Sequence, residues 1–156
     1  MGRKYLSLIP LIVVVLIAYF FYSKSLTQSS YNGLPTVPCI DQTQPIKESF
    51  SFHVSINING KTYPVETNIG HDYGQCLHTI YTNNSTGTVF VRSNTSQNYT
   101  LGDFFRVWHK TFNQDQIFDY KVDNSHSIRV LVNGSDMNTF DNTVIKPADS
   151  IEVIYQ

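Results

Sequence analysis

Two cysteines, Cys39 and Cys76, are the residues of this chain whose type and spacing most directly suggest chemistry. In an oxidising compartment such a pair can close a loop of roughly 38 residues and stabilise the fold by about 4 kcal/mol in the chain-entropy treatment. Two free thiols and a metal-bound pair are the alternatives. We expect a disulfide that joins the end of a linker to a folded domain.

Motifs that would indicate catalysis are absent from the sequence. It contains no nucleophile elbow, no zinc-protease helix motif and no phosphate-binding glycine loop. The lone carboxylates also lack a spacing that acid–base chemistry would require. We therefore expect no enzymatic activity. We also expect no nucleic-acid partner, because the net charge is -1 and no basic patch is indicated.

Residues 5–22 form an apolar run without a charged residue, and two basic residues precede it. A helix of this length spans roughly 27 Å, which is close to the hydrocarbon thickness of a bilayer. The preceding basic residues favour a cytoplasmic N-terminus. A cleaved signal peptide is the alternative, but the bulky Phe20, Phe21 and Tyr22 stand where cleavage needs small residues. We therefore expect an uncleaved anchor.

The anchor sets the expected organisation of the chain. Residues 1–4 are predicted to be a cytoplasmic tail, 5–22 the transmembrane anchor, 23–48 a linker and 49–156 an extracytoplasmic domain. The linker is assigned because it is rich in proline, poor in apolar residues and without periodicity. The chain is thus expected to be a single-pass protein of the cell membrane, with its C-terminal domain outside the cytoplasm.

Five Asn-x-Ser/Thr sequences occur where loops or turns are expected. Such sequences are acceptors for N-glycosylation in exported proteins, so their positions agree with the predicted compartment. The candidate sites are Asn83, Asn84, Asn94, Asn98 and Asn133.

Strand patterns begin the predicted domain. Apolar residues occupy every second position from Phe50 to Ile58, which predicts a strand with one buried face and places His53 on the other face. Asn59 and Gly60 predict a tight hairpin after it, because both residues tolerate positive φ. A second hairpin is expected from strands over residues 77–81 and 88–92.

One amphipathic helix is expected after Thr100. Thr100 and Asp103 can form a capping box, and apolar residues recur at helical spacing from Leu101 to Phe112. This stripe must pack on a sheet, so Trp108, which lies on it, is expected to be a core residue rather than a ligand platform.

The C-terminal stretch VLVNG followed by NTVIKPADSIEVIY resembles the closing half of β-grasp, ubiquitin-like domains. Those domains have a strand, Asn-Gly and then a turn into the last strand, although Ala148 stands here where they usually have glycine. The order of hairpins, one helix and further strands predicts an α+β fold, and the resemblance implies that its sheet is β-grasp-like. In this fold, an N-terminal transmembrane helix precedes a β-grasp-like mixed sheet with one crossing amphipathic helix.

A second resemblance covers roughly residues 53–108. Its blocks are His-x-x-Ile-x-Ile-Asn-Gly from His53, Cys-x-His-Thr from Cys76 and Thr-Leu-Gly-Asp-Phe-Phe-x-Val-Trp from Thr100. This pattern resembles an uncharacterised family of membrane-anchored archaeal and bacterial extracytoplasmic proteins. Histidine pairs in that family look like metal ligands. This chain keeps His53 and His78 but has Ser51, among others, where further ligands would stand.

The resemblance leaves two functional expectations. The first is a non-catalytic extracytoplasmic binding or interaction module without a cofactor, which meets an unknown protein or small ligand outside the cell. The alternative is a copper- or zinc-binding extracytoplasmic protein with a partly degenerate site formed by His53, His71 and His78. A closed site for either metal needs three or four ligands, so this trio would be a minimal set.

Overall fold

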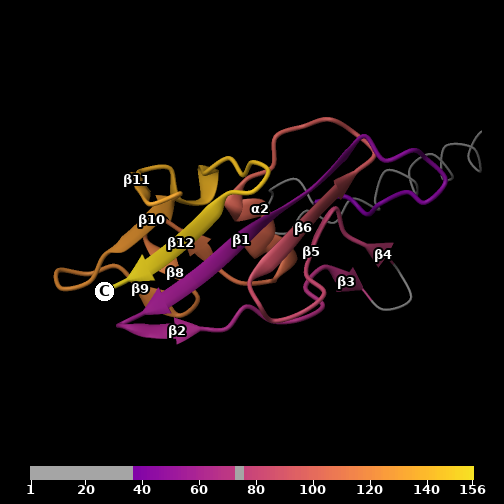
Figure 1. Ribbon diagram of the computed structural model, residues 1–156. Helices are drawn as coiled ribbons and strands as arrows, with labels where there is room; N and C mark the ends of the chain where they lie inside the picture. Colours follow the sequence, from indigo (N-terminus) through magenta and orange to yellow (C-terminus); the bar gives the residue numbers. More distant parts are fainter. Residues whose placement is uncertain (1–36, 73–75) are drawn as a thin grey trace, which may run out of the picture. The chain divides into compact units, whose positions relative to one another are not determined.

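The computed structural model describes residues 37–72 and 76–156 (Figure 1). Val37–Gln156 forms one compact unit. The predicted tail and anchor, residues 1–4 and 5–22, lie outside the described residues. Within the described part, no helix combines the length and the apolar content that a membrane span requires.

A seven-stranded mixed sheet forms the centre of this unit, in the order β11-β10-β12-β1-β6-β5, with β2 paired to β1. β1 is parallel to β12 on one side and antiparallel to β6 on the other. Figure 1 shows the long β1 arrow between β12 and β6. The strands are β1 (Glu48–Ile58), β2 (Lys61–Tyr63), β5 (Ile80–Tyr81), β6 (Thr88–Ser93), β10 (Ile128–Val132), β11 (Ser135–Met137) and β12 (Ser150–Tyr155).

Two smaller sheets and two short helices complete the described elements. β3 (His71–Asp72) pairs with β4 (Cys76–Leu77). A three-stranded sheet follows the α-helix α2 (Leu101–Val107), and a 3₁₀ helix, η2 (Phe140–Asn142), precedes β12. The strands of the three-stranded sheet are β7 (Phe112–Asn113), β8 (Gln116–Ile117) and β9 (Tyr120–Lys121).

The period-two pattern of β1 is confirmed. Its apolar side chains from Phe52 to Ile58 are buried, whereas His53 is exposed. The predicted hairpin is also confirmed, because β2 pairs with the end of β1. Asn59 and Gly60 form the turn with φ values of 51° and 79°, the left-handed conformation that these two residue types adopt most easily.

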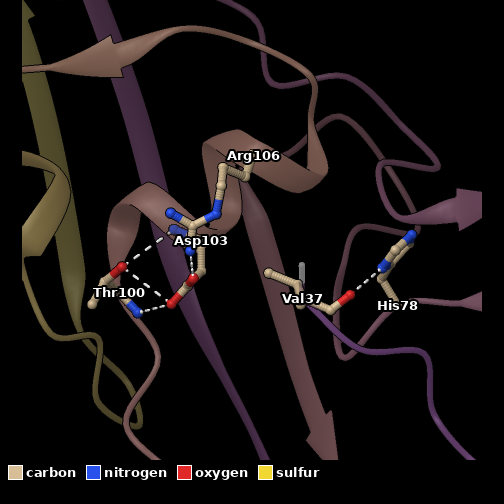
Figure 2. A network of polar contacts seen from close by, with 5 residues as sticks. All are labelled: Val37, His78, Thr100, Asp103 and Arg106. Carbon is tan, nitrogen blue, oxygen red and sulfur yellow. Dashed lines mark hydrogen bonds and ion pairs between the residues drawn. The ribbon is translucent and has the colours of Figure 1, made fainter. Parts of the chain in front are cut away.

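The capping box predicted at the start of α2 is confirmed (Figure 2). The Asp103 backbone N–H donates to Thr100 Oγ1 at 3.2 Å, and the Thr100 N–H donates to Asp103 Oδ2 at 2.7 Å. Arg106, one turn later, forms an ion pair with Asp103. These contacts satisfy N–H groups that the first turn of a helix leaves without partners.

The core lies between α2 and the sheet. Phe104 of α2 is fully buried and contacts Phe52 of β1 edge to face, with ring centroids 6.3 Å apart. Trp108 is 5% exposed and contacts the Phe104 ring, with centroids 5.6 Å apart, which confirms its prediction as a core residue. The helix thus stabilises the sheet through burial of aromatic surface.

The predicted α+β, β-grasp-like fold class is wrong. The described chain is mostly strands, and its one α-helix has 7 residues. The apolar stripe that predicted a longer helix continues to Phe112, but the chain leaves the helix at Trp108. His109 adopts a left-handed φ of 56°, and Phe112 begins β7 as a buried residue. The last residue of the apolar stripe, Phe112, therefore belongs to the three-stranded sheet rather than to the helix.

Candidate functional site

His53 lies on the polar face of β1, where its side chain is exposed. Its ring packs over Gly87, the residue before β6, so that a Cβ atom added to Gly87 would lie 2.8 Å from His53 Cε1. The register that pairs His53 with Thr88 fixes this position. Its neighbours on this side are the turn before β6 and β6 itself.

His71 and His78 lie in the hairpin region of β3 and β4. His71 contacts Tyr81 edge to face, with ring centroids 5.7 Å apart, and its Nε2 atom is buried without a hydrogen-bond partner. His78 follows β4, and its Nδ1 atom lies 2.9 Å from the Val37 carbonyl oxygen (Figure 2). Its Nε2 atom lies 2.9 Å from Asp72 Oδ2.

Both hydrogen-bond partners of His78 are acceptors. The Val37 carbonyl and the Asp72 carboxylate each accept, so both contacts are hydrogen bonds when the imidazole carries a proton on each nitrogen. In that state His78 links two parts of the chain: Val37, in the segment before β1, and Asp72, in β3.

The predicted disulfide between Cys39 and Cys76 is confirmed. Its Cα atoms are 5.6 Å apart, within the usual range for the bond. Cys39 forms a β-bridge with His78, and the Ile40 N–H donates to the Leu77 carbonyl at 2.8 Å. The disulfide thus reinforces backbone pairing between the segment before β1 and β4.

One group of potential metal ligands occurs among residues 37–72 and 76–156. Single donor atoms of Cys39, Cys76 and His78 all lie within 4.8 Å of one another. His53 and His71 do not belong to this group, so the structure does not gather the predicted trio in such a cluster. A copper or zinc site on His53, His71 and His78 stays a prediction from the sequence.

Four side chains lie on the same face of the paired segments around the disulfide. We call this the disulfide face, and it consists of Cys39, Asp72, Cys76 and His78. Cys39 is opposite His78 in a β-bridge, and Asp72 is opposite Cys76 in the β3–β4 register. Cys76 and His78 are two residues apart along an extended segment, and therefore point to the same side. The spacing Cys-x-His hints at part of this face, but the sequence contains no signal for the contact with Asp72.

A cavity of about 190 Å³ adjoins this region, and we call it the β3 pocket. It is lined by residues 66–72, which lead into β3, and residues 107–109, which end α2. The two segments meet closely at Gly70, where an added Cβ atom would lie 3.0 Å from Val107 Cγ1. The same atom would lie 2.4 Å from the Ile80 carbonyl oxygen of β5. Glycine at this position allows the loop to pass β5.

Two buried ring nitrogens distinguish the β3 pocket. Trp108 Nε1 and His71 Nε2 belong to lining residues, and neither has a hydrogen-bond partner. An indole N–H is a donor only. A buried polar atom without a partner costs about 1–3 kcal/mol. The indole N–H lacks an acceptor, and His71 Nε2 lacks a donor or an acceptor according to its tautomer. Sequence reasoning missed this property of Trp108, because it depends on what surrounds the ring in three dimensions.

A second cavity, of about 300 Å³, is lined by residues 48–50, 97–99 and 144–147. It is larger than the β3 pocket, but no unpartnered buried side-chain nitrogen or oxygen of the described residues belongs to its lining. The β3 pocket is therefore the stronger candidate for recognition of a polar ligand.

The candidate glycosylation sites differ in their surroundings. Asn83, Asn84, Asn98 and Asn133 are exposed, and Asn94 is half-buried. The Asn94 side-chain nitrogen donates to the backbone carbonyls of residues 41, 44 and 45. Asn133 Nδ2 donates to Asp149 Oδ1 at 2.9 Å. Asn94, half-buried and bonded to three backbone carbonyls, is thus the least accessible of the five.

Comparison of the chain with protein families, with curated proteins and with solved structures gives no match.

Proposed function

We propose that this chain is a single-pass membrane-anchored module that binds a small polar ligand outside the cytoplasm, without catalysis. The observation that carries the proposal is the β3 pocket, two of whose lining residues hold a buried ring nitrogen without a hydrogen-bond partner, Trp108 Nε1 and His71 Nε2. Few, well-placed polar groups in a concave site are typical of ligand recognition.

Support for the extracytoplasmic location comes from the disulfide between Cys39 and Cys76. Such bonds persist in oxidising compartments and are rare in the cytosol. The apolar run of residues 5–22 and the exposed acceptor asparagines agree with an anchored, exported and glycosylated protein. This location would place the β3 pocket outside the cytoplasm.

The pocket favours a compact ligand with oxygen acceptors. Trp108 Nε1 can only donate, and His71 Nε2 donates when it carries a proton. The carboxylates of Glu66 and Asp72 also line the pocket, so a hydroxyl or amide group that both accepts and donates would suit it better than a plain anion. A volume of about 190 Å³ admits a molecule of a few heavy atoms.

Fluorescence of Trp108 tests binding, because it is the one tryptophan of the chain. We expect glycerol or N-methylacetamide, added to the full chain in detergent, to shift the emission saturably, and acetate to act more weakly. His71→Phe should remove the shift, because it deletes both ring nitrogens, including Nε2, and keeps a planar ring. His53→Ala, on the other side of β1, serves as the matched control. Equal responses in wild type and His71→Phe, or no response to any probe, would contradict the proposed ligand site.

Protease treatment of sealed cells tests the location separately. With the cytoplasmic side protected by the membrane, a tag after Gln156 should be digested while a cytoplasmic reporter survives. A tag that resists digestion until the membrane is opened would refute the extracytoplasmic location. The ligand site would be unaffected by that result, because the fluorescence titration uses purified protein.

A further inference from the structure

The disulfide face carries four side chains of the kinds that bind zinc. Donor atoms of Cys39, Cys76 and His78 lie within 4.8 Å of one another, and Asp72 Oδ2 lies 2.9 Å from His78 Nε2. Thiolate, imidazole and carboxylate are the ligands that Zn²⁺ takes in proteins, in sets of four at structural sites. With the disulfide formed, the two sulfur atoms are unavailable as thiolates.

We propose that reduction of the Cys39–Cys76 disulfide converts this face into a zinc site with Cys39, Cys76, His78 and Asp72 as ligands. The site would be occupied in the reduced protein and lost on oxidation. This inference goes beyond the proposed ligand pocket and does not depend on it.

The redox step requires a dithiol as reductant. The dithiol supplies two electrons and two protons, the S–S bond breaks, both cysteines become thiols and the dithiol becomes a disulfide. Zn²⁺ then binds the two sulfurs as thiolates, and the two thiol protons pass to solvent. An incoming disulfide reverses the sequence: it takes two electrons from the thiolates and two protons from solvent and becomes a dithiol, the protein S–S bond forms and Zn²⁺ leaves.

The backbone already holds the two cysteines at a suitable separation. Their Cα atoms are 5.6 Å apart, in paired segments. Two Zn–S bonds of about 2.3 Å at a tetrahedral angle place the sulfurs about 3.8 Å apart. Rotation about the two Cα–Cβ bonds reaches that separation, so the backbone pairing of Cys39 with His78 can stay intact.

His78 has the environment of a metal-bound histidine. Ligating histidines commonly donate their other ring N–H to a backbone carbonyl, which fixes the tautomer and the ring orientation. The Val37 carbonyl, 2.9 Å from Nδ1, provides this acceptor (Figure 2). Nε2 is then the coordinating atom, and Asp72, its present partner, supplies the fourth ligand.

The disulfide face is accessible both to the attacking thiolate and to zinc. Cys39 is exposed and the Asp72 side chain is 46% exposed. Thiol–disulfide exchange requires access of the attacking thiolate to a disulfide sulfur, and the exposed Cys39 provides it. Zinc can approach from the same side.

Cobalt titration of the full chain in detergent tests the site. After reduction with a phosphine under anaerobic conditions, wild-type protein should bind one Co²⁺ with a thiolate-to-cobalt charge-transfer band and the strong d–d absorption of tetrahedral coordination. Zn²⁺ should displace it. The oxidised protein, which has the same sequence, should show neither band. Absence of the charge-transfer band in reduced wild type would overturn the proposal.

Variants assign the ligands. Cys39→Ser should lose the charge-transfer band of paired thiolates, and His78→Ala should bind Co²⁺ roughly tenfold or more weakly. His53→Ala is the matched histidine control and should bind as wild type does. Far-UV circular dichroism and Trp108 emission show whether each variant is folded. If a variant unfolds, reduced wild-type protein with both cysteines alkylated replaces it as the non-binding reference. His78→Ala with wild-type affinity would also overturn the proposal.

Discussion

Replacing both Cys39 and Cys76 with alanine should lower the free energy of unfolding by about 4 kcal/mol. The bond joins residues separated by 37 positions, and opening a loop of this length returns conformational entropy to the unfolded chain. Urea denaturation of the full chain in detergent, followed by Trp108 emission, measures the change. Because small domains have a stability of about 5–15 kcal/mol, this loss would leave a marginal fold.

The two single variants provide the control. Cys39→Ala and Cys76→Ala should each destabilise the protein as much as the double variant does, because either substitution alone opens the loop. Additive losses would contradict the loop-closure explanation and point instead to packing of the individual side chains.

Phe104→Ala should lower the free energy of unfolding by about 3–5 kcal/mol, the usual cost of removing a buried aromatic side chain. Phe104 is 0% exposed and contacts rings on both the sheet and its own helix. Its centroid distances are 6.3 Å to Phe52 and 5.6 Å to Trp108. The substitution should also weaken the near-ultraviolet circular dichroism of the folded protein, because the remaining rings pack less tightly around the cavity. Urea denaturation gives the magnitude.

Val144→Ala is the matched control for Phe104→Ala. Val144 is 40% exposed, so its truncation should change the stability by less than about 1 kcal/mol. Similar losses for the two variants would mean that α2 does not anchor the core as described.

The strand pattern of β1 could be predicted because its cause is local. Alternation assigns each side chain of a strand to one face, and Asn59-Gly60 determines where the chain turns. The parallel pairing of β1 with β12 could not be read from either segment, because it depends on partners far apart in the sequence.

The extent of α2 shows where a local pattern fails. The apolar stripe is the same for a long helix and for a short helix followed by a buried strand, since both bury Phe112. Tertiary packing decides between them: Phe112 stacks on Phe105 with centroids 4.4 Å apart, and Ile117, opposite it in β8, is fully buried. The fold class was predicted incorrectly for the same reason, because such short strands carry too few residues to show a period.

Some features of the candidate sites could likewise be predicted from the sequence and others could not. The disulfide could be predicted from residue type and compartment, and it is confirmed. The contact between Asp72 and His78 depends on the β3–β4 register, and the unpartnered nitrogen of Trp108 depends on how α2 meets the loop before β3. Neither arrangement leaves a periodic or compositional trace in the sequence.

The parallel pairing of β1 with β12 has a consequence for biogenesis. His53 is opposite Ser150 and Ile58 is opposite Tyr155, so the central strand lacks one neighbour until nearly the whole described chain has been synthesised. Contacts between distant segments form slowly because loop closure must precede them. Until then the emerging polypeptide has an unpaired strand edge, which is open to pairing with other chains.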